Sequence, residues 1–163
     1  MDVGLNAVEI LEIAERIEQN GADFYQKAAN IFDDPDISRT FIRLAEWETK
    51  HECIFSNMRR QILESGTQTG THISSGGELS DAKVMAGLAV FGIRPEPSNM
   101  LSGRENEADI INGAIEREKD SIVFYTGLKD FAPSKENIQI INSIIEEELE
   151  HIRILNRFRG RRE

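Results

Sequence analysis

Apolar residues recur at alternating steps of three and four along four long stretches of the chain. This rhythm places them on one face of an α-helix, so it predicts four amphipathic helices that bury their apolar faces against one another. Pro35 suits the first turn of the second helix, and Pro133 separates the third helix from the fourth. Asn6 suits an N-cap, while Gly66 and Gly160 suit C-terminal ends. The predicted helices cover approximately residues 6–32, 36–64, 103–131 and 134–159.

The two halves of the chain repeat each other at an offset of one hundred residues. The pattern Ala-x3-Glu-x2-(Gly/Ser)-x2-Phe-Tyr occurs at residues 14–25 and again at 114–125. Such a repeat predicts an all-α fold, in which two helical hairpins pack as a four-helix bundle in one domain spanning 1–163. Residues 65–102 are rich in Gly, Ser and Thr and are long for a connection. We expect a crossover between the hairpins there, with one short helix at about 81–91.

Ionisable residues interrupt the core face of every predicted helix at one level of the bundle. The first and third helices carry a single Glu there, and the second and fourth carry a Glu-x-x-His pair. Residues three apart share a helix face, so each pair directs a carboxylate and an imidazole toward one region. In each hairpin these residues lie about sixteen residues from the turn, which is about 24 Å at the α-helical rise. The six residues predicted to meet are Glu18, Glu48, His51, Glu118, Glu148 and His151.

This predicted cluster has the composition of a dinuclear metal centre. Four carboxylates buried close together are unfavourable alone, because each buried charge costs several kcal/mol of desolvation. Two divalent cations would supply four positive charges against the four negative ones. Carboxylates can bridge two metals, and an oxygen-rich set with imidazole and without thiolate favours iron or manganese.

Further residues near the cluster are interpreted from their place on the helix. Tyr25 and Tyr125 lie on the core faces one heptad past the single glutamates; they pack in the core, donate to a metal ligand or relay electrons. Trp47 lies off the core face and is expected to pack around the centre, with electron transfer as the less favoured alternative. The arginines between 153 and 162 complement the negative end of the last helix, with docking of an acidic redox partner as the alternative. Eight other glutamates are expected on solvated faces: Glu9, Glu12, Glu15, Glu46, Glu52, Glu146, Glu147 and Glu150.

Composition and charge exclude several classes of function. The formal net charge of −10 argues against a surface for nucleic acid or for an anionic membrane, both of which require Lys and Arg. One cysteine, Cys53, excludes an intrachain disulfide and an iron centre held by four thiolates. The N-terminal residues have no basic segment and the chain has no apolar run long enough to span a bilayer, so a cytoplasmic location is expected.

The repeated motifs, each followed by a helix with Glu-x-x-His, resemble the rubrerythrin branch of the ferritin-like di-iron carboxylate superfamily. The resemblance covers about residues 6–64 and 103–159. It implies that all six cluster residues bind metal, that two iron ions are the cofactor, and that Glu48 and Glu148 bridge them. Manganese or a mixed pair is the alternative, and a homodimer is implied. The chain differs in carrying Ile115 where rubrerythrins have an extra Glu, and in lacking a four-Cys rubredoxin domain.

Four functions are compatible with such a centre. The first is a di-iron redox enzyme that reduces peroxide or O2 with electrons from an external donor protein or small reductant. The second is iron handling, in which the centre oxidises iron(II) for storage. In the third, the metal only stabilises a bundle without catalytic activity. The fourth is a dimanganese catalase, which metal analysis distinguishes from the first.

Overall fold

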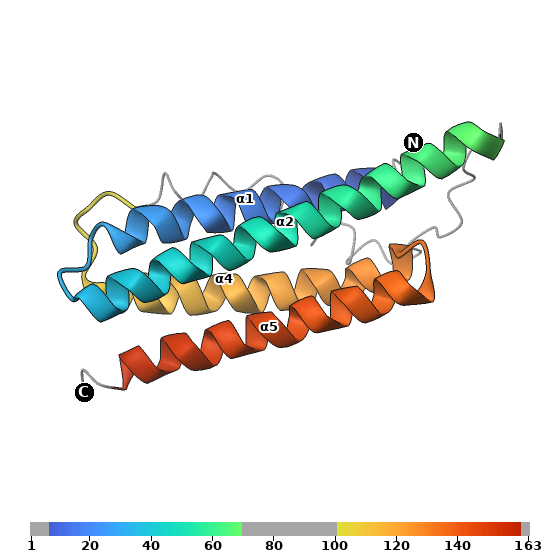
Figure 1. Cartoon of the computed structure of the whole chain (residues 1–163). Helices are drawn as coiled ribbons and strands as arrows, with labels where there is room; N and C mark the ends of the chain where they lie inside the picture. Colours follow the sequence, from blue (N-terminus) through green and yellow to red (C-terminus); the bar gives the residue numbers. More distant parts are fainter. Residues whose placement is uncertain (1–6, 70–100, 161–163) are drawn as a thin grey trace, which may run out of the picture.

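The computed structural model describes residues 7–69 and 101–160. The described chain is helical and contains no strand, which confirms the predicted all-α four-helix bundle. The long helices have nearly aligned axes (Figure 1). They are α1 (Ala7–Ala29), α2 (Pro35–Thr69), α4 (Glu107–Leu128) and α5 (Lys135–Arg159), with a short 3-10 helix, η2 (Lys129–Phe131), before α5.

The helices form two antiparallel hairpins that stack on each other. The turn between α1 and α2 and the turn between α4 and α5 lie at opposite ends of the bundle (Figure 1). The last residue of α2 and the first residue of α4 are likewise at opposite ends, as the predicted crossover between hairpins requires. The short helix expected at 81–91 lies outside the described residues.

Side-chain caps explain where the helices begin. The Asp34 carboxylate accepts from the Asp36 backbone N–H at 2.8 Å, just as α2 starts. The Asn106 side chain accepts from the Asp109 N–H at 2.8 Å and the Ser134 hydroxyl accepts from the Asn137 N–H at 3.1 Å. These bonds satisfy N–H groups that the first turn of a helix leaves without an internal partner. Asn6, expected to cap the first helix, lies outside the described residues.

Helix ends differ from the sequence expectation in two places. The first helix stops at Ala29 rather than near 32, where the Ser38 hydroxyl of α2 donates to the Ala29 carbonyl at 2.8 Å. The prediction that Gly66 ends the second helix is wrong, because α2 continues to Thr69. Gly66 has no left-handed φ, and a glycine inside a helix costs only about 1 kcal/mol. The Ser65 hydroxyl also bonds back to the Gln61 carbonyl within α2 at 2.8 Å.

The apolar core consists of two clusters on either side of a charged layer. One is built around Phe41, Leu44 and Ile111, and the other around Leu11, Phe55 and Ile141. The residues expected on the core faces of α1 and α2 are all buried. The bundle therefore encloses one polar layer between two apolar ones.

None of the helices in the described ranges has a stretch that is both long and apolar enough to span a bilayer.

Candidate metal centre

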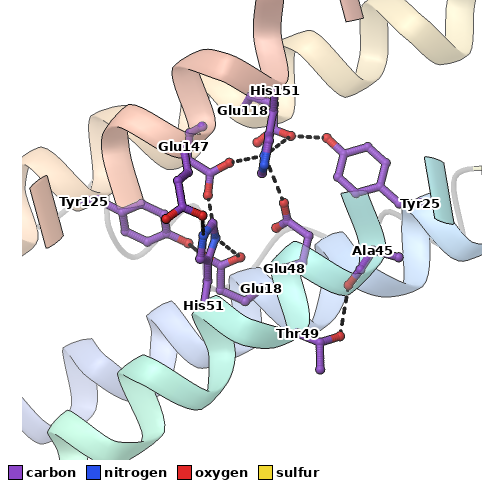
Figure 2. A network of polar contacts seen from close by, with 11 residues as sticks. Glu18, Tyr25, Ala45, Glu48, Thr49, His51, Glu118, Tyr125, Glu147 and His151 are labelled. Atoms are coloured by element: carbon purple, nitrogen blue, oxygen red, sulfur yellow. Dashed lines mark hydrogen bonds and ion pairs between the residues drawn. The ribbon is translucent and has the colours of Figure 1, made fainter. Parts of the chain in front are cut away.

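The structure brings together all six residues that the sequence singled out. α1 contributes Glu18, α4 contributes Glu118, and α2 and α5 each contribute one Glu-x-x-His pair (Figure 2). None of the six is more than 3% exposed to solvent. Charges buried this deeply cost free energy unless opposite charges or hydrogen bonds compensate them, and the apolar layers above and below provide neither.

The ligand atoms form two overlapping groups. In each group, one donor atom from every residue lies within 4.8 Å of the others. Glu48 and Glu148 belong to both groups, so their carboxylates lie between two adjacent positions that a metal ion could occupy. One group adds Glu18 and His51, and the other adds Glu118 and His151.

Two carboxylate oxygens of the cluster, one of Glu18 and one of Glu48, have no hydrogen-bond partner among the described residues. His51 Nδ1 lies 3.0 Å from a carboxylate oxygen of Glu148, a contact that is a hydrogen bond only while the imidazole nitrogen carries a proton. Buried polar atoms in native proteins almost always have a partner, so the unpaired oxygens need one, and the Glu148 oxygen needs one as soon as His51 loses that proton. Metal ions supply it, and the residues present therefore fit a pair of cations.

Mutual repulsion and burial change the pKa values of the shared carboxylates. Burial raises the pKa of Glu48 well above its ordinary value, and the nearby charges of Glu18, Glu148 and Glu118 raise it further. Burial and the charge of Glu118 raise the pKa of Glu148 to about 8. Without cations, protons take the place of metal in this layer.

The two histidines are shifted by the carboxylates around them. Burial lowers the pKa of His51, but hydrogen bonds and charge from Glu148 and Glu18 outweigh it and raise the pKa to about 11. Against the same effect of burial, Glu118 and Glu148 raise the pKa of His151 to about 9. Both imidazoles must lose a proton before they can bind a metal.

Two tyrosines connect the hairpins through the cluster. The Tyr25 hydroxyl of α1 donates to Glu118 of α4, and the Tyr125 hydroxyl of α4 donates to Glu18 of α1 (Figure 2). Burial raises the pKa of both phenols well above the ordinary value, and the neighbouring carboxylates add to this, so both remain donors. Core packing and hydrogen bonding to the cluster, which the sequence left as alternatives, occur together in the same side chains.

The outer side of each imidazole contacts a different kind of residue. His51 Nε2 lies 3.2 Å from a carboxylate oxygen of Glu147, although the Glu147 side chain is 53% exposed. The His151 ring instead stacks on Trp47, with ring centroids 4.8 Å apart and planes 19° from parallel. Residues 47 and 147 are equivalent in the repeat, so the two halves of the centre are chemically different. Glu147 is exposed, as expected of a residue on a solvated face, and α5 also turns its carboxylate toward the histidine of α2.

Glu15 also departs from the expectation of a solvated face. It is 8% exposed and forms an ion pair with Arg59 of α2, with Oε1 2.5 Å from Nε and Oε2 3.0 Å from a terminal guanidinium nitrogen. A bidentate contact of this kind between an arginine and a carboxylate compensates the buried negative charge of Glu15. Glu15 is therefore part of the α1–α2 interface and lies outside both donor groups.

Gly21 allows α1 to approach α2 at the level of the centre. A Cβ atom at this position would lie 2.6 Å from a carboxylate oxygen of Glu48. The repeat-equivalent residue is Ser121, so the small side chain in the motif is a requirement of space. This contact is the physical reason for the Gly/Ser position of the motif in α1.

We expect Gly21→Ala to weaken metal binding without destabilising the metal-free protein. The added methyl displaces the end of Glu48, while alanine favours the helix by about 1 kcal/mol. Metal affinity, measured by competition with a chelator, should fall about tenfold, and metal-free thermal stability should hold or rise. Ser121→Ala is the control. Unchanged affinity in Gly21→Ala would show that Glu48 does not need its present position.

We expect Glu147→Gln to weaken binding of a divalent ion by about tenfold, because a carboxylate on the outer nitrogen of a ligating histidine fixes the tautomer that leaves the inner nitrogen free. Cobalt(II) titration followed by its visible absorption measures both the affinity and the coordination. The control is Glu146→Gln on the same helix, whose side chain is exposed. Equal metal affinities for the two variants would show that Glu147 does not contribute to metal binding.

The fold is a ferritin-like four-helix bundle, and the Glu/His cluster is a candidate site for two metal ions. A crystal structure of a protein from Thermotoga maritima, provisionally described as a ferritin-like diiron-carboxylate protein, is similar to this chain with a TM-score of 0.70. The sequences are 28% identical, and the match covers 94% of each chain. No protein-family model and no curated protein matches the chain. The similarity and the Glu/His cluster support the ferritin-like superfamily, and the rubrerythrin-like assignment stays a prediction from the motifs.

Proposed function

We propose that this chain is a di-iron redox protein that reduces peroxide or O2 with electrons from an external donor. The observation that carries the proposal is that Glu48 and Glu148 belong to both donor groups. Carboxylates shared by two metals hold them close together, which allows a pair of one-electron ions to complete a two-electron reduction.

Each metal position would have its own carboxylate and imidazole. Glu18 and His51 would hold one ion, Glu118 and His151 the other, and Glu48 and Glu148 would lie between them. When bound, iron supplies the one-electron steps between its ferrous and ferric states. The four carboxylates and two neutral imidazoles would balance the charge of two divalent ions.

The protein's own groups prepare the site for this chemistry. The tyrosine hydroxyls hold Glu18 and Glu118 in place, so these carboxylates need less reorganisation when a cation arrives. Burial of all six residues keeps bulk water away, which strengthens electrostatic interactions and limits leakage of reactive oxygen species.

Oxidation of iron(II) for storage or delivery is the second candidate function. Ile115, at the position where rubrerythrins have an extra Glu, is 3% exposed and packs in an apolar cluster. The chain therefore lacks a carboxylate that the rubrerythrin comparison would place there. Ferroxidase activity requires the same dinuclear site but no reductant other than iron(II) itself.

Metal analysis of protein produced with iron available tests the proposal, with visible spectra recorded before and after peroxide. We expect about two irons per chain, as in other dinuclear carboxylate bundles, and an absorption band of an oxo-bridged pair that grows on oxidation. Consumption of peroxide with an added reductant supports the first function, and consumption of iron(II) with O2 supports the second. Two manganese ions would redirect the assignment to catalase chemistry, and a folded protein that loads no metal would contradict the site.

A further inference from the structure

A pocket opens between α2 and α5 beside the metal centre. It has a volume of about 340 Å³ and is lined by Thr40, Arg43, Trp47, Ile154, Arg157 and Phe158. Trp47 links the pocket to the centre, because its indole ring also stacks on the imidazole of His151. His151 Nδ1 in turn lies 2.8 Å from a carboxylate oxygen of Glu148. One aromatic ring thus separates the pocket from a candidate metal ligand.

Two guanidinium groups give this pocket a positive charge on a protein of net charge −10. Arg43 is exposed, lies 5.3 Å from the centroid of the Trp47 ring, and has no carboxylate within ion-pair distance in the described residues. Arg157 donates to Glu150 at 3.1 Å through one nitrogen and keeps its other donors. Its side chain is 66% exposed. The pocket therefore combines aromatic and apolar walls with hydrogen-bond donors for an anion.

These features are absent from the equivalent position in the other half of the repeat. The cluster residues keep their identity at an offset of one hundred, whereas the pocket residues do not. Both arginines and both aromatic residues are replaced there. The corresponding residues are Ile140, Ser143, Glu147, Ile54, Asn57 and Met58. The helices pack at the repeat-equivalent position without arginines or a tryptophan. Helix packing therefore does not account for Arg43, Arg157 and Trp47 in the pocket.

We propose that the pocket binds a planar, anionic, aromatic reductant of the reduced flavin mononucleotide class, whose electrons reach the metal centre through Trp47 and His151. A phosphate would pair with Arg43 and Arg157, and the ring system would pack against Trp47 and Phe158. The concave pocket suits a small molecule better than the flat face of a protein. A donor must act from outside the centre, because none of the six cluster residues is more than 3% exposed.

The electron-transfer step rests on the proposed di-iron function, whereas the binding step does not. The reduced flavin loses two electrons and two protons and becomes the oxidised flavin. Two ferric ions held by the cluster residues would each gain one electron and become ferrous, and the two protons would pass to the solvent. One flavin molecule therefore reduces one dinuclear centre.

Trp47 is the single tryptophan of the chain and lines the pocket, so its intrinsic fluorescence is sensitive to a ligand bound there. The full-length protein is titrated with oxidised flavin mononucleotide, with riboflavin and with inorganic phosphate, and calorimetry measures the same affinities independently. We expect saturable quenching by flavin mononucleotide and an affinity at least about tenfold above that for riboflavin, since hydrogen bonds to a charged phosphate are worth more than 1.4 kcal/mol. Equal affinities for the two flavins, or no binding of either, overturn the proposal.

Substitutions locate the site and separate binding from electron transfer. Arg43→Gln and Arg157→Gln should each weaken binding of flavin mononucleotide about tenfold. The matched control is Arg153→Gln, an arginine of α5 that also pairs with Glu150 but does not line the pocket. Losses that are no larger in the pocket variants than in this control contradict the assignment.

Trp47→Phe tests the path of the electrons. In anaerobic stopped-flow experiments with the iron-loaded protein, it should slow oxidation of reduced flavin mononucleotide at least about tenfold, while calorimetry shows affinity within about twofold of the wild type. An unchanged rate of flavin oxidation would show that Trp47 does not carry the electrons. A protein that binds flavin but loads no iron contradicts the proposed function and leaves the binding site standing.

Discussion

Glu48→Gln is expected to abolish loading of the metal pair and at the same time to stabilise the metal-free protein. Metal content should fall from about two ions per chain to one or fewer, because a neutral amide cannot replace a bridging carboxylate between two cations. The melting temperature of the metal-free protein should rise by about 2–4 °C, the shift that about 1 kcal/mol produces in a domain of roughly this size.

The loss of metal binding and the gain in metal-free stability both follow from the position of Glu48 in the cluster. Burial, together with the charges of Glu18, Glu148 and Glu118, raises the pKa of Glu48 well above its ordinary value. Folding of the metal-free chain at neutral pH must therefore protonate a carboxyl that is ionised in the unfolded chain, and this costs free energy. Glutamine has the same shape and removes that cost.

The matched control is Glu46→Gln, an exposed glutamate on the same helix. It should change neither the metal content nor the melting temperature. Metal analysis and calorimetry on both proteins, with and without chelator, make the comparison. A Glu48→Gln protein that loads two ions, or that is less stable than the wild type without metal, would show that Glu48 is an ordinary packing residue.

The second large effect is on pH dependence: without metal, stability should fall as pH rises from about 5 to about 11. The folded-state pKa of Glu148, about 8, lies above its ordinary value of 4.5. The pKa values of His151 and His51, about 9 and about 11, lie above 6.5. Each group therefore binds its proton more tightly in the folded state. Its stabilising contribution is complete below the unfolded pKa and is lost as pH passes through the folded one.

Metal binding should have the opposite dependence on pH. The cations require deprotonated Glu148, His51 and His151, so binding at neutral pH releases protons and becomes tighter as pH increases. Calorimetric titration with a divalent ion in two buffers of different ionisation enthalpy counts the protons released. Chemical denaturation of the metal-free protein at several pH values measures its stability. Constant stability over this range, together with no proton release, would contradict the coupled layer of charges.

Glu118 changes the pH dependence of stability in the opposite direction, because its pKa is lowered in the folded state. Burial would raise its pKa, but hydrogen bonds with His151, Glu148 and Tyr25 lower it below its ordinary value. The contribution of Glu118 is present above pH 4.5 and is lost as pH falls through its lower folded-state pKa. The metal-free protein should therefore be most stable at mildly acidic pH, between the range where Glu118 is protonated and the range where the other three groups lose their protons.

Helical periodicity was sufficient to predict the fold class and the meeting of six residues. Glu18 and Glu118 interrupt otherwise apolar or small faces, and two Glu-x-x-His pairs do the same at matching distances from the turns. A charge on a core face is informative because burial makes it costly. The repeat then predicted two similar hairpins, although not which helix of one lies against which helix of the other.

Residues off the core faces could not be interpreted in this way. The pattern does not distinguish Glu15 and Glu147 from the other glutamates off the core faces, yet Glu15 pairs with Arg59 and Glu147 contacts His51. The end of α2 was also misjudged at Gly66, because a helix held by neighbouring turns tolerates one glycine. In each case, contacts with residues outside the local pattern determined the outcome.

The sequence by itself determined which side chains face the interior, because the spacing of residues along a helix fixes the face on which they lie. Only the tertiary structure decided which groups touch across the bundle. It paired Tyr25 with Glu118 and Tyr125 with Glu18, and it placed Trp47 against His151. Contacts between helices depend on how the two hairpins are stacked and rotated, and no periodicity within one helix contains that information.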